Sequence, residues 1–220
     1  MNYLQMAQEV RKLIGIQGTG PSSVAATGAE GVILATVKQV WEDIQNYRSD
    51  WKWMREDKSF NLVAGKALYT ITDIFTPQNR FKSWYKDSFY ISVNGKKSPI
   101  RFLEYDFFEY AHINDSEQVI PSEFTIKPKD YSFWTSIPNS NYLIDCDYKK
   151  SNQTLTSATD TPECPADYHW LIVYEATARY ALSIALGSIY DQYNQKASEL
   201  LGSLLREHNP KKIFKIRGIA

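Results

Sequence analysis

Residues 165–208 have the sequence PADYHWLIVYEATARYALSIALGSIYDQYNQKASELLGSLLREH, and this stretch decides the fold. In its first half nearly every residue is apolar or small. The only charges between Tyr168 and Leu186 are Glu175 and Arg179, which are four residues apart and would share one exposed stripe of a helix. Apolar residues then continue at steps of three and four. The stretch therefore predicts a buried helix, a kink or tight turn at Gly187 and Ser188, and a second helix with a narrower apolar face.

Two earlier segments are the expected packing partners of these helices. Residues 28–51 place Ile33, Val37, Val40 and Ile44 at steps of four and three, which is the period of one helix face. Residues 3–14 form a shorter amphipathic pattern of the same kind. The glycine-rich residues 15–28 between them are expected to be an exposed loop. Helices as apolar as these must bury their faces against one another.

Between residues 53 and 159 the hydrophobic period changes to two, which predicts strands. Residues 60–71, with Ala64, Gly65 and Lys66 at the centre, are predicted to form a hairpin. A second hairpin is expected at Asn94-Gly95, because this dipeptide tolerates positive φ at both central turn positions. Further strands are expected at 123–127, 131–136 and 141–148, with an edge strand at 154–156.

One short helix is expected inside this β region, at residues 103–112. Leu103, Phe107 and Tyr110 are predicted to lie on one side of it. The order of elements is then helix, helix, β region, helix, helix.

The predicted fold class is α+β, an antiparallel helical bundle with an inserted antiparallel β domain. Residues 1–51 would supply the N-terminal helices and residues 161–209 the C-terminal helices of the bundle. Residues 52–160 would form the inserted domain, and residues 210–220 a basic tail.

The whole-chain charge does not call for a particular partner. The chain has 220 residues with 25 basic and 25 acidic side chains. A balanced chain shows no general preference for nucleic acid, for a membrane surface or for an acidic substrate. Residues 1–14 are typical of an amphipathic helix and not of a signal sequence, and the charges Glu175 and Arg179 argue against a membrane span. No membrane association is therefore expected.

The residues that usually carry chemistry are scattered. His112, His169 and His208 lie far apart in the sequence, and Cys146 and Cys164 show no metal-ligand spacing. The pattern predicts no cofactor, no metal site and no enzyme activity, and two cysteines without a disulfide framework favour synthesis in a reducing cytoplasm. His169 is interpreted as a satisfied core or interface histidine.

Two further patterns in the β region allow a functional interpretation beside a structural one. Asp145 and Asp147 would share one strand face as paired carboxylates, although alternation with apolar residues favours a solvated face. Trp84 and Trp134 could form a platform for stacking a sugar, although aromatic residues in strands usually belong to a core or an interface.

The C-terminal tail is basic and also apolar. We expect it to become ordered on a partner protein, because a purely solvated tail has no need of large apolar side chains; nucleic-acid binding and a disordered terminus are the alternatives. The residues predicted to bind the partner are Lys211, Lys212, Ile213, Phe214, Lys215, Ile216 and Arg217.

Several segments in order carry a resemblance to a known family. They are Tyr3-Leu4-Gln5, Trp41-Glu42-Asp43-Ile44-Gln45, Trp51-Lys52-Trp53, residues 60–71 with Gly65 and Tyr69, residues 128–148, and Cys164-Pro165-Ala166-Asp167-Tyr168-His169 before the helix through Glu175-Ala176. In this order, nearly the whole chain resembles the head-to-tail adaptor proteins of tailed bacteriophages. The resemblance is to the type that joins the portal to the tail in podovirus-like particles.

The resemblance implies a structural virion protein at the neck of the particle, synthesised in the host cytoplasm and without catalytic residues. It implies a ring, usually of twelve copies, whose partners are the portal protein, tail or nozzle proteins and other copies of the chain. Double-stranded DNA would pass through without sequence-specific binding, and residues 211–217 would dock onto the portal. Two alternatives remain: a tail-completion or tail-tube protein, and a carbohydrate-binding module that uses the aromatic β region.

Overall fold

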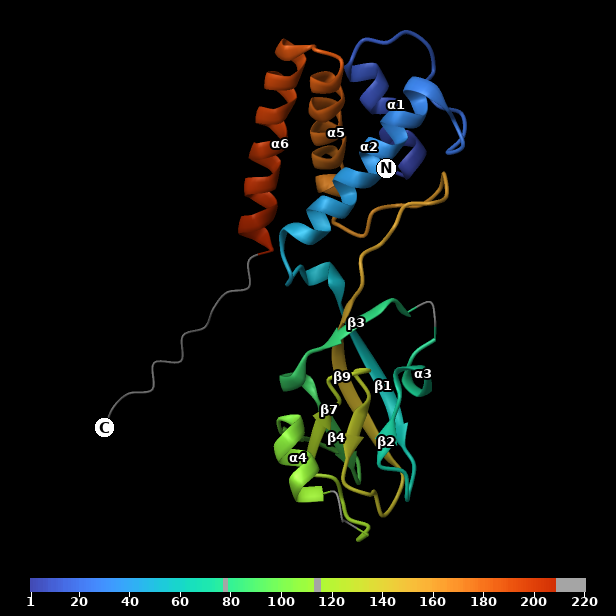
Figure 1. Cartoon of the computed structure of the whole chain (residues 1–220). Helices are drawn as coiled ribbons and strands as arrows, with labels where there is room; N and C mark the ends of the chain where they lie inside the picture. Colours follow the sequence, from blue (N-terminus) through green and yellow to red (C-terminus); the bar gives the residue numbers. More distant parts are fainter. Residues whose placement is uncertain (77–78, 113–115, 209–220) are drawn as a thin grey trace, which may run out of the picture. The chain divides into compact units, whose positions relative to one another are not determined.

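The computed structural model describes residues 1–76, 79–112 and 116–208. The chain divides into two compact units, which are described separately below (Figure 1). The helical unit contains Met1–Trp53 and the residues from Asn152 onward, and the β unit contains Met54–Ser151. The described residues form helices α1 to α6 and two sheets, so the predicted α+β class is confirmed. The finer prediction of an antiparallel helical bundle stays a prediction.

The helical unit has four long helices, at the places that the apolar periods predict. They are α1 (Tyr3–Leu13), α2 (Gly28–Tyr47), α5 (His169–Ser183) and α6 (Gly187–Glu207). Helix α1 packs on α2 and α5, and α5 also packs on α2 and α6. The predicted tight turn between the last two helices is confirmed, but it falls at residues 184–186. Ala185 adopts φ +60° there, and Gly187 already begins α6.

The core of the helical unit comes from the predicted faces of three helices. Its fully buried side chains include Met6, Ala7 and Val10 from α1, Ile33, Val37, Val40 and Trp41 from α2, and Ile172, Val173, Ala176 and Ala181 from α5. Trp51 is also fully buried beyond the end of α2, and its indole N–H donates to the Ile44 carbonyl at 2.9 Å. This bond satisfies a carbonyl in the last turn of the helix, where no backbone N–H is available.

The segment that leads from the β unit to α5 is held by a side chain and not by a strand. Gln45 of α2 is buried and accepts a hydrogen bond from the Gln153 N–H at 2.7 Å, while its amide donates to the Gln153 carbonyl at 2.9 Å. Residues 154–156 are described and belong to no strand, so the predicted edge strand is wrong. The Gln45 amide supplies the pairing that a neighbouring strand would have supplied.

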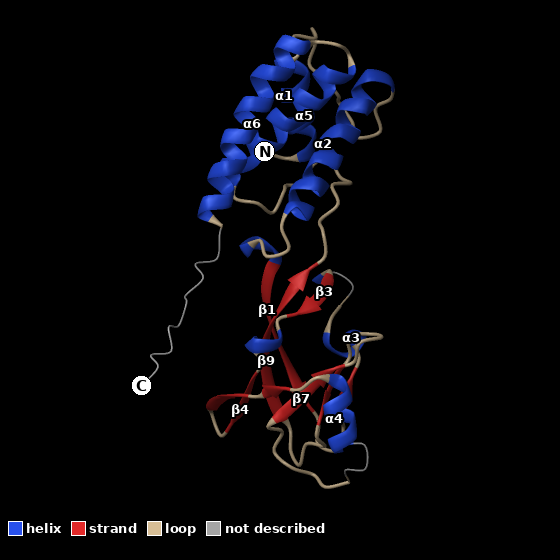
Figure 2. Cartoon of the chain, turned by 60° about the vertical axis from the view of Figure 1, so that its left-hand side comes forward, coloured by secondary structure: helices blue, strands red, loops and turns tan. Residues whose placement is uncertain are grey.

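The first sheet of the β unit is built around one long strand, β9 (Tyr142–Lys150) (Figure 2). On one side, β9 pairs along its length with β1 (Arg55–Leu62). On its other side, it pairs with β4 (Tyr90–Val93) and with β3 (Phe81–Trp84), and β4 continues the sheet to β5 (Lys96–Pro99). All these pairings are antiparallel.

The second sheet is smaller and has the order β2, β8, β7, β6. Its strands are β2 (Leu68–Tyr69), β6 (Arg101–Phe102), β7 (Glu123–Ile126) and β8 (Phe133–Thr135), of which β6 and β7 are parallel. Helices α3 (Ile71–Ile74) and α4 (Tyr105–His112) belong to the same unit, and single 3₁₀ turns occur at Lys52–Met54, Lys86–Ser88 and Ala166–Tyr168. Aromatic residues from both sheets share one core, in which the Phe89 and Phe124 ring centroids are 4.3 Å apart.

One of the two predicted hairpins is confirmed. Strands β4 and β5 pair with Val93 opposite Lys96, and the two-residue loop between them has φ +51° at Asn94 and +77° at Gly95. These are the positive angles that a type I′ turn needs. The predicted hairpin at residues 60–71 is wrong: β1 pairs with β9, β2 pairs with β8, and the two segments belong to different sheets.

The short helix predicted at residues 103–112 is confirmed as α4, and the side that carries Phe107 and Tyr110 is its exposed one. The side chain that α4 buries is Phe108, whose ring packs 5.2 Å from that of Trp134. Phe107 and Tyr110 are 76% and 90% exposed. The two faces of this helix are almost equally apolar, so periodicity alone did not distinguish them.

Candidate functional site

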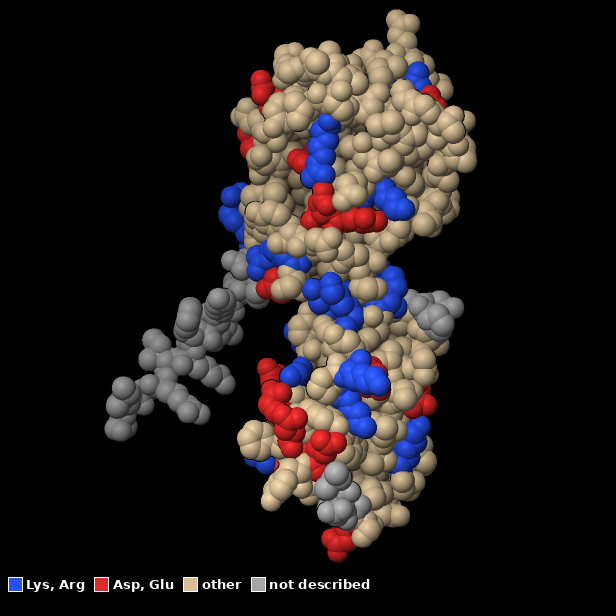
Figure 3. Space-filling model, viewed as in Figure 1, with Lys and Arg blue, Asp and Glu red and all other residues tan. Residues whose placement is uncertain are grey.

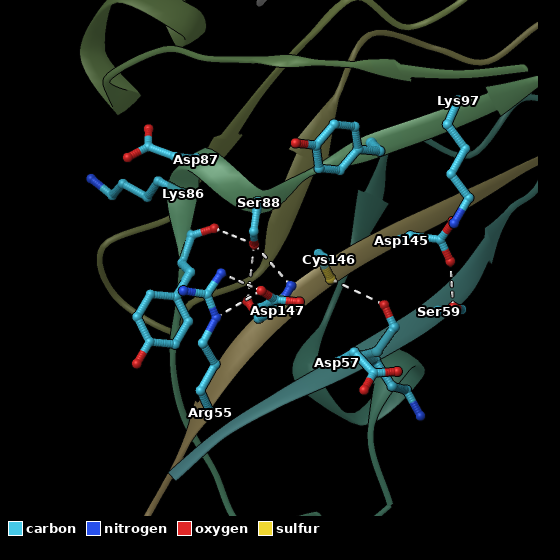
Figure 4. A pocket seen from close by; sticks show the side chains of 13 residues that line it. Arg55, Asp57, Ser59, Lys86, Asp87, Ser88, Lys97, Asp145, Cys146 and Asp147 are labelled. Carbon is cyan, nitrogen blue, oxygen red and sulfur yellow. Dashed lines mark hydrogen bonds and ion pairs between the residues drawn. The ribbon is translucent and has the colours of Figure 1, made fainter. Parts of the chain in front are cut away.

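A polar pocket of about 500 Å³ lies on the outer face of the first sheet (Figure 4). The alternation of strands places Arg55, Asp57 and Ser59 of β1 beside Asp145 and Asp147 of β9. The rest of the pocket lining includes the 3₁₀ turn Lys86–Ser88 and Lys97 of β5. The pocket is therefore lined by carboxylates and cations in similar number.

Asp147 is held through both its side chain and its backbone. The Arg55 guanidinium donates to it, with the Nε–Oδ2 distance at 2.7 Å, and stacks over the Tyr85 ring at 4.5 Å. The Asp147 backbone N–H donates to the Ser88 hydroxyl at 2.8 Å. Cation–π stacking and a shared carboxylate hold the guanidinium in one orientation.

Asp145 has its own cation and its own hydroxyl donor. The Lys97 ammonium lies 2.7 Å from Oδ2, and the Ser59 hydroxyl donates to Oδ1. The hydrogen bonds from Lys97 and then from Ser59 hold the pKa of Asp145 below its ordinary value. The two aspartates lie on the face that alternation predicts, and each is ion-paired to a different cation (Figure 4).

The one cysteine among the described residues in the lining of this pocket is not placed as a nucleophile. The Cys146 side chain is buried and its thiol donates to the Lys58 carbonyl at 3.5 Å. Burial raises the pKa of Cys146 well above its ordinary value, and burial raises that of Cys164 to about 12. Within the described residues, no group of three or more His, Cys, Asp or Glu side chains could hold a metal ion.

The histidine of the buried helix has the structural role that the sequence predicts. His169 is 2% exposed, and its two ring nitrogens lie within hydrogen-bond distance of the Met1 amine, at 2.7 Å, and of the Pro162 and Cys164 carbonyls, at 3.3 Å. Burial lowers its pKa, so the neutral imidazole is favoured.

A second, smaller cavity of about 190 Å³ lies on the helical unit, where Arg179 of α5 joins two carboxylates. The predicted pair with Glu175 is confirmed at 2.8 Å, and Arg179 also contacts Asp43 of α2 at 2.5 Å. Tyr47, which is 60% exposed, lies at the edge of this cavity. The cross-helix contact to Asp43 was missed because nothing in the local spacing relates α2 to α5.

The predicted sugar-stacking pair does not form an exposed platform. Trp84 is buried in the core of the β unit, and its indole N–H donates to the Tyr131 carbonyl at 2.8 Å. Trp134 lies against Phe108 of α4, with Lys127 over its ring at 4.8 Å. The core interpretation of these tryptophans is confirmed. The predicted partner-binding residues Lys211, Lys212, Ile213, Phe214, Lys215, Ile216 and Arg217 lie outside the described residues.

Exposed apolar side chains form two surfaces that the sequence analysis did not separate from the core. The first is the outer face of α4, with Phe107 and Tyr110. The second is the C-terminal end of α5 and the turn that follows it, where Leu182 is 61% and Ile184 43% exposed. Contiguous exposed apolar side chains commonly mark contacts with other proteins. No described helix combines the length and apolarity that crossing a bilayer requires.

Exposed surfaces of this kind are typical of proteins that assemble with other proteins. The family model described as SU10 adaptor protein matches residues 1–212, and the chain belongs to this family. A comparison with curated proteins found no match. Membership supports a structural role as a phage adaptor, a class that is not enzymatic, and implies a place in the virion and contacts with portal and tail proteins.

Proposed function

We propose that the protein forms a ring of twelve copies at the neck of the virion, where it joins the portal to the tail and lines the DNA conduit. The observation that carries this proposal is membership of the adaptor family over residues 1–212. The β unit begins at Met54 and ends at Ser151, with segments of the helical unit before and after it in the chain, which supports the further proposal that the β unit is a domain inserted between the helices.

The exposed surfaces support assembly into a closed ring. A ring subunit needs two different lateral faces, because each copy contacts its neighbours through heterologous interfaces. Phe107 and Tyr110 on α4 and Leu182 and Ile184 at the C-terminal end of α5 offer apolar area on separate units. Aromatic side chains are enriched in such interfaces.

The charge of the chain supports the role of a conduit that lets DNA pass. A protein that neutralises many phosphates binds DNA tightly and in a salt-dependent way. Here 25 basic side chains are balanced by 25 acidic ones. In the polar pocket of the β unit, Arg55 and Lys97 are each paired with a carboxylate. Weak, non-specific contact with the passing duplex is therefore expected.

The C-terminal residues 211–217 are proposed to supply a contact with the portal. Four cations alternate there with Ile213, Phe214 and Ile216. Deletion of residues 210–220 should abolish capture by portal rings and leave the far-UV circular dichroism of the described helices unchanged. Full portal binding by the shortened protein would overturn this assignment.

The ring itself is tested by light scattering coupled to size exclusion, on the protein alone and after mixing with portal rings. We expect either a ring or monomers that join the portal in a complex of twelve chains with twelve. A sixfold assembly would favour the alternative of a tail-completion or tail-tube protein. A chain that remains monomeric with portal at every concentration would contradict the proposal.

A further inference from the structure

Helix α4 carries acidic side chains beside its exposed aromatic ones. Glu104 precedes the helix, and Asp106 and Glu109 lie within it, while no lysine or arginine occurs between Arg101 and Lys127. Figure 3 shows acidic side chains gathered on the side of the β unit where α4 lies. Nearby, the Lys86 ammonium lies 3.6 Å from Glu104, and both side chains are substantially exposed.

The fold of the β unit does not need the outer face of this helix. Phe108 anchors α4 against Trp134, and the Tyr105 ring also packs near Trp134, at 6.1 Å. Phe107 and Tyr110 are three residues apart, so they share the opposite face, where they are 76% and 90% exposed. Two large aromatic side chains among carboxylates form a surface that a basic, apolar segment would complement.

The chain itself contains such a segment. Residues 211–217 read KKIFKIR, with four cations and three large apolar residues, and no acidic residue follows Glu207. The end of α6, which precedes this segment in the chain, is fixed to the helical unit. The Lys52 ammonium donates to the Glu207 carbonyl at 3.0 Å, and the His208 ring packs 5.1 Å from that of Trp53. The charge and the apolar content of residues 211–217 both match the outer face of α4.

We infer that the outer face of α4, formed by Glu104, Asp106, Phe107 and Tyr110, binds residues 211–217 of a second copy of the chain. This contact goes beyond the proposed function, because it joins copies of the protein in the absence of a portal. It is heterologous, since the segment of one copy meets the helix of the next, and it can therefore be repeated around a ring. One segment cannot occupy two sites at once, so portal binding competes with the α4 face.

The test uses the full-length protein without portal, with the photoreactive residue p-benzoylphenylalanine in place of Phe214. Isotope-labelled and unlabelled copies are mixed before irradiation, so that mass spectrometry separates links between copies from links within one copy. We expect links between copies that map to the peptide containing residues 104–110. Links confined to one copy, or links between copies that map elsewhere, would overturn the inference.

Variants test the chemistry of the contact. Phe107→Ser with Tyr110→Ser should lower the yield of links between copies at least fivefold, whereas Val32→Ser, at an exposed apolar site on α2 that belongs to neither proposed interface, should leave it unchanged. An equal loss in both proteins would contradict a specific role for α4.

A charge exchange keeps the inference testable if the serine variants misfold. Glu104→Lys with Asp106→Lys should lower the yield, and adding Lys211→Glu with Lys212→Glu should restore it. Failure of the exchanged charges to restore the yield would refute the pairing. No portal is present in these experiments. A negative result would therefore refute only the contact between α4 and residues 211–217, and the proposed neck ring would still be tested by light scattering with portal rings.

Discussion

Replacing Gln45 with alanine tests how the helical unit holds the chain segment that precedes α5. The Gln45 side chain is 2% exposed and pairs with both backbone groups of Gln153, accepting from the N–H at 2.7 Å and donating to the carbonyl at 2.9 Å. Its amide also lies 3.2 Å from the Trp41 carbonyl. Truncation to alanine removes the side-chain amide, so the Gln153 N–H and the Gln153 carbonyl lose their hydrogen-bond partners together.

The expected magnitude follows from these bonds. A buried donor or acceptor that loses its partner costs about 1–3 kcal/mol. Two such groups are affected, but Gln153 is only half-buried, so water can satisfy part of what is lost. Alanine has a higher helix propensity than glutamine, which offsets a few tenths of a kcal/mol of this loss. We therefore expect Gln45→Ala to lower the free energy of unfolding of the helical unit by about 2–3 kcal/mol.

Asn46→Ala is the matched control. Asn46 is the next residue of the same helix, and it also bonds to the same segment, accepting from the Asn152 amide at 2.8 Å, but this bond is exposed. Its loss should change the free energy of unfolding by less than about 0.5 kcal/mol.

Urea unfolding followed by circular dichroism at 222 nm measures both variants, and hydrogen exchange of the Gln153 amide reports the bond directly. The reasoning would be refuted if Gln45→Ala cost no more than Asn46→Ala, or if the Gln153 amide kept its protection.

Three further predictions concern single residues. Because burial lowers the pKa of His169, the unfolded chain binds its proton more readily and stability should fall as pH decreases below 6.5; His169→Gln should flatten that decline in a urea series across pH, and an unchanged slope would count against it. Burial raises the thiol pKa of Cys146 and Cys164, so a maleimide at neutral pH should modify both only after unfolding, and rapid labelling of the folded protein would contradict this. Gly95→Ala should destabilise the β unit by about 1 kcal/mol in thermal unfolding, because alanine is strained at a φ of +77°. No atom lies within 4 Å of the new methyl group, so the backbone angle is the whole expected cause; a gain in stability would contradict a positive φ at this position.

The features that were predictable from the sequence are those that local rules determine. The faces of α2 and α5 follow a period that any buried helix must keep, and Asn94-Gly95 specifies its turn through backbone angles alone. The alternation of β9 likewise placed Asp145 and Asp147 on an outer face. None of these inferences needed knowledge of a distant partner.

The errors concern partners that are distant in sequence. The segments on either side of Gly65 were assigned to one hairpin because they are neighbours in the chain, yet Leu62 pairs with Tyr142 and Tyr69 with Phe133. The role of Gln45 was missed for the same reason. Its only local signal is its place four residues after Trp41, on the buried side of α2.

In the candidate sites too, local patterns predicted some residues, whereas contacts with residues distant in the sequence were missed. The sequence identified Asp145 and Asp147, the carboxylates of the polar pocket. Their ion-pair partners, Arg55 and Lys97, depend on strand register and could not be predicted from residue spacing. The sequence did not show which side of α4 is buried, because Phe107 and Phe108 are equally apolar and only the position of Trp134 decides between them.

The pairing of β1 with β9 has a consequence for the history of such chains. Arg55, next to the first residue of the β unit, lies opposite Lys149, close to its last. Paired antiparallel residues have Cα atoms about 4.5–5.5 Å apart, so the unit begins and ends at nearly one point. A recombination event could therefore remove residues 54–151, or exchange them for another folded module, and a short peptide bridge would rejoin the cut ends.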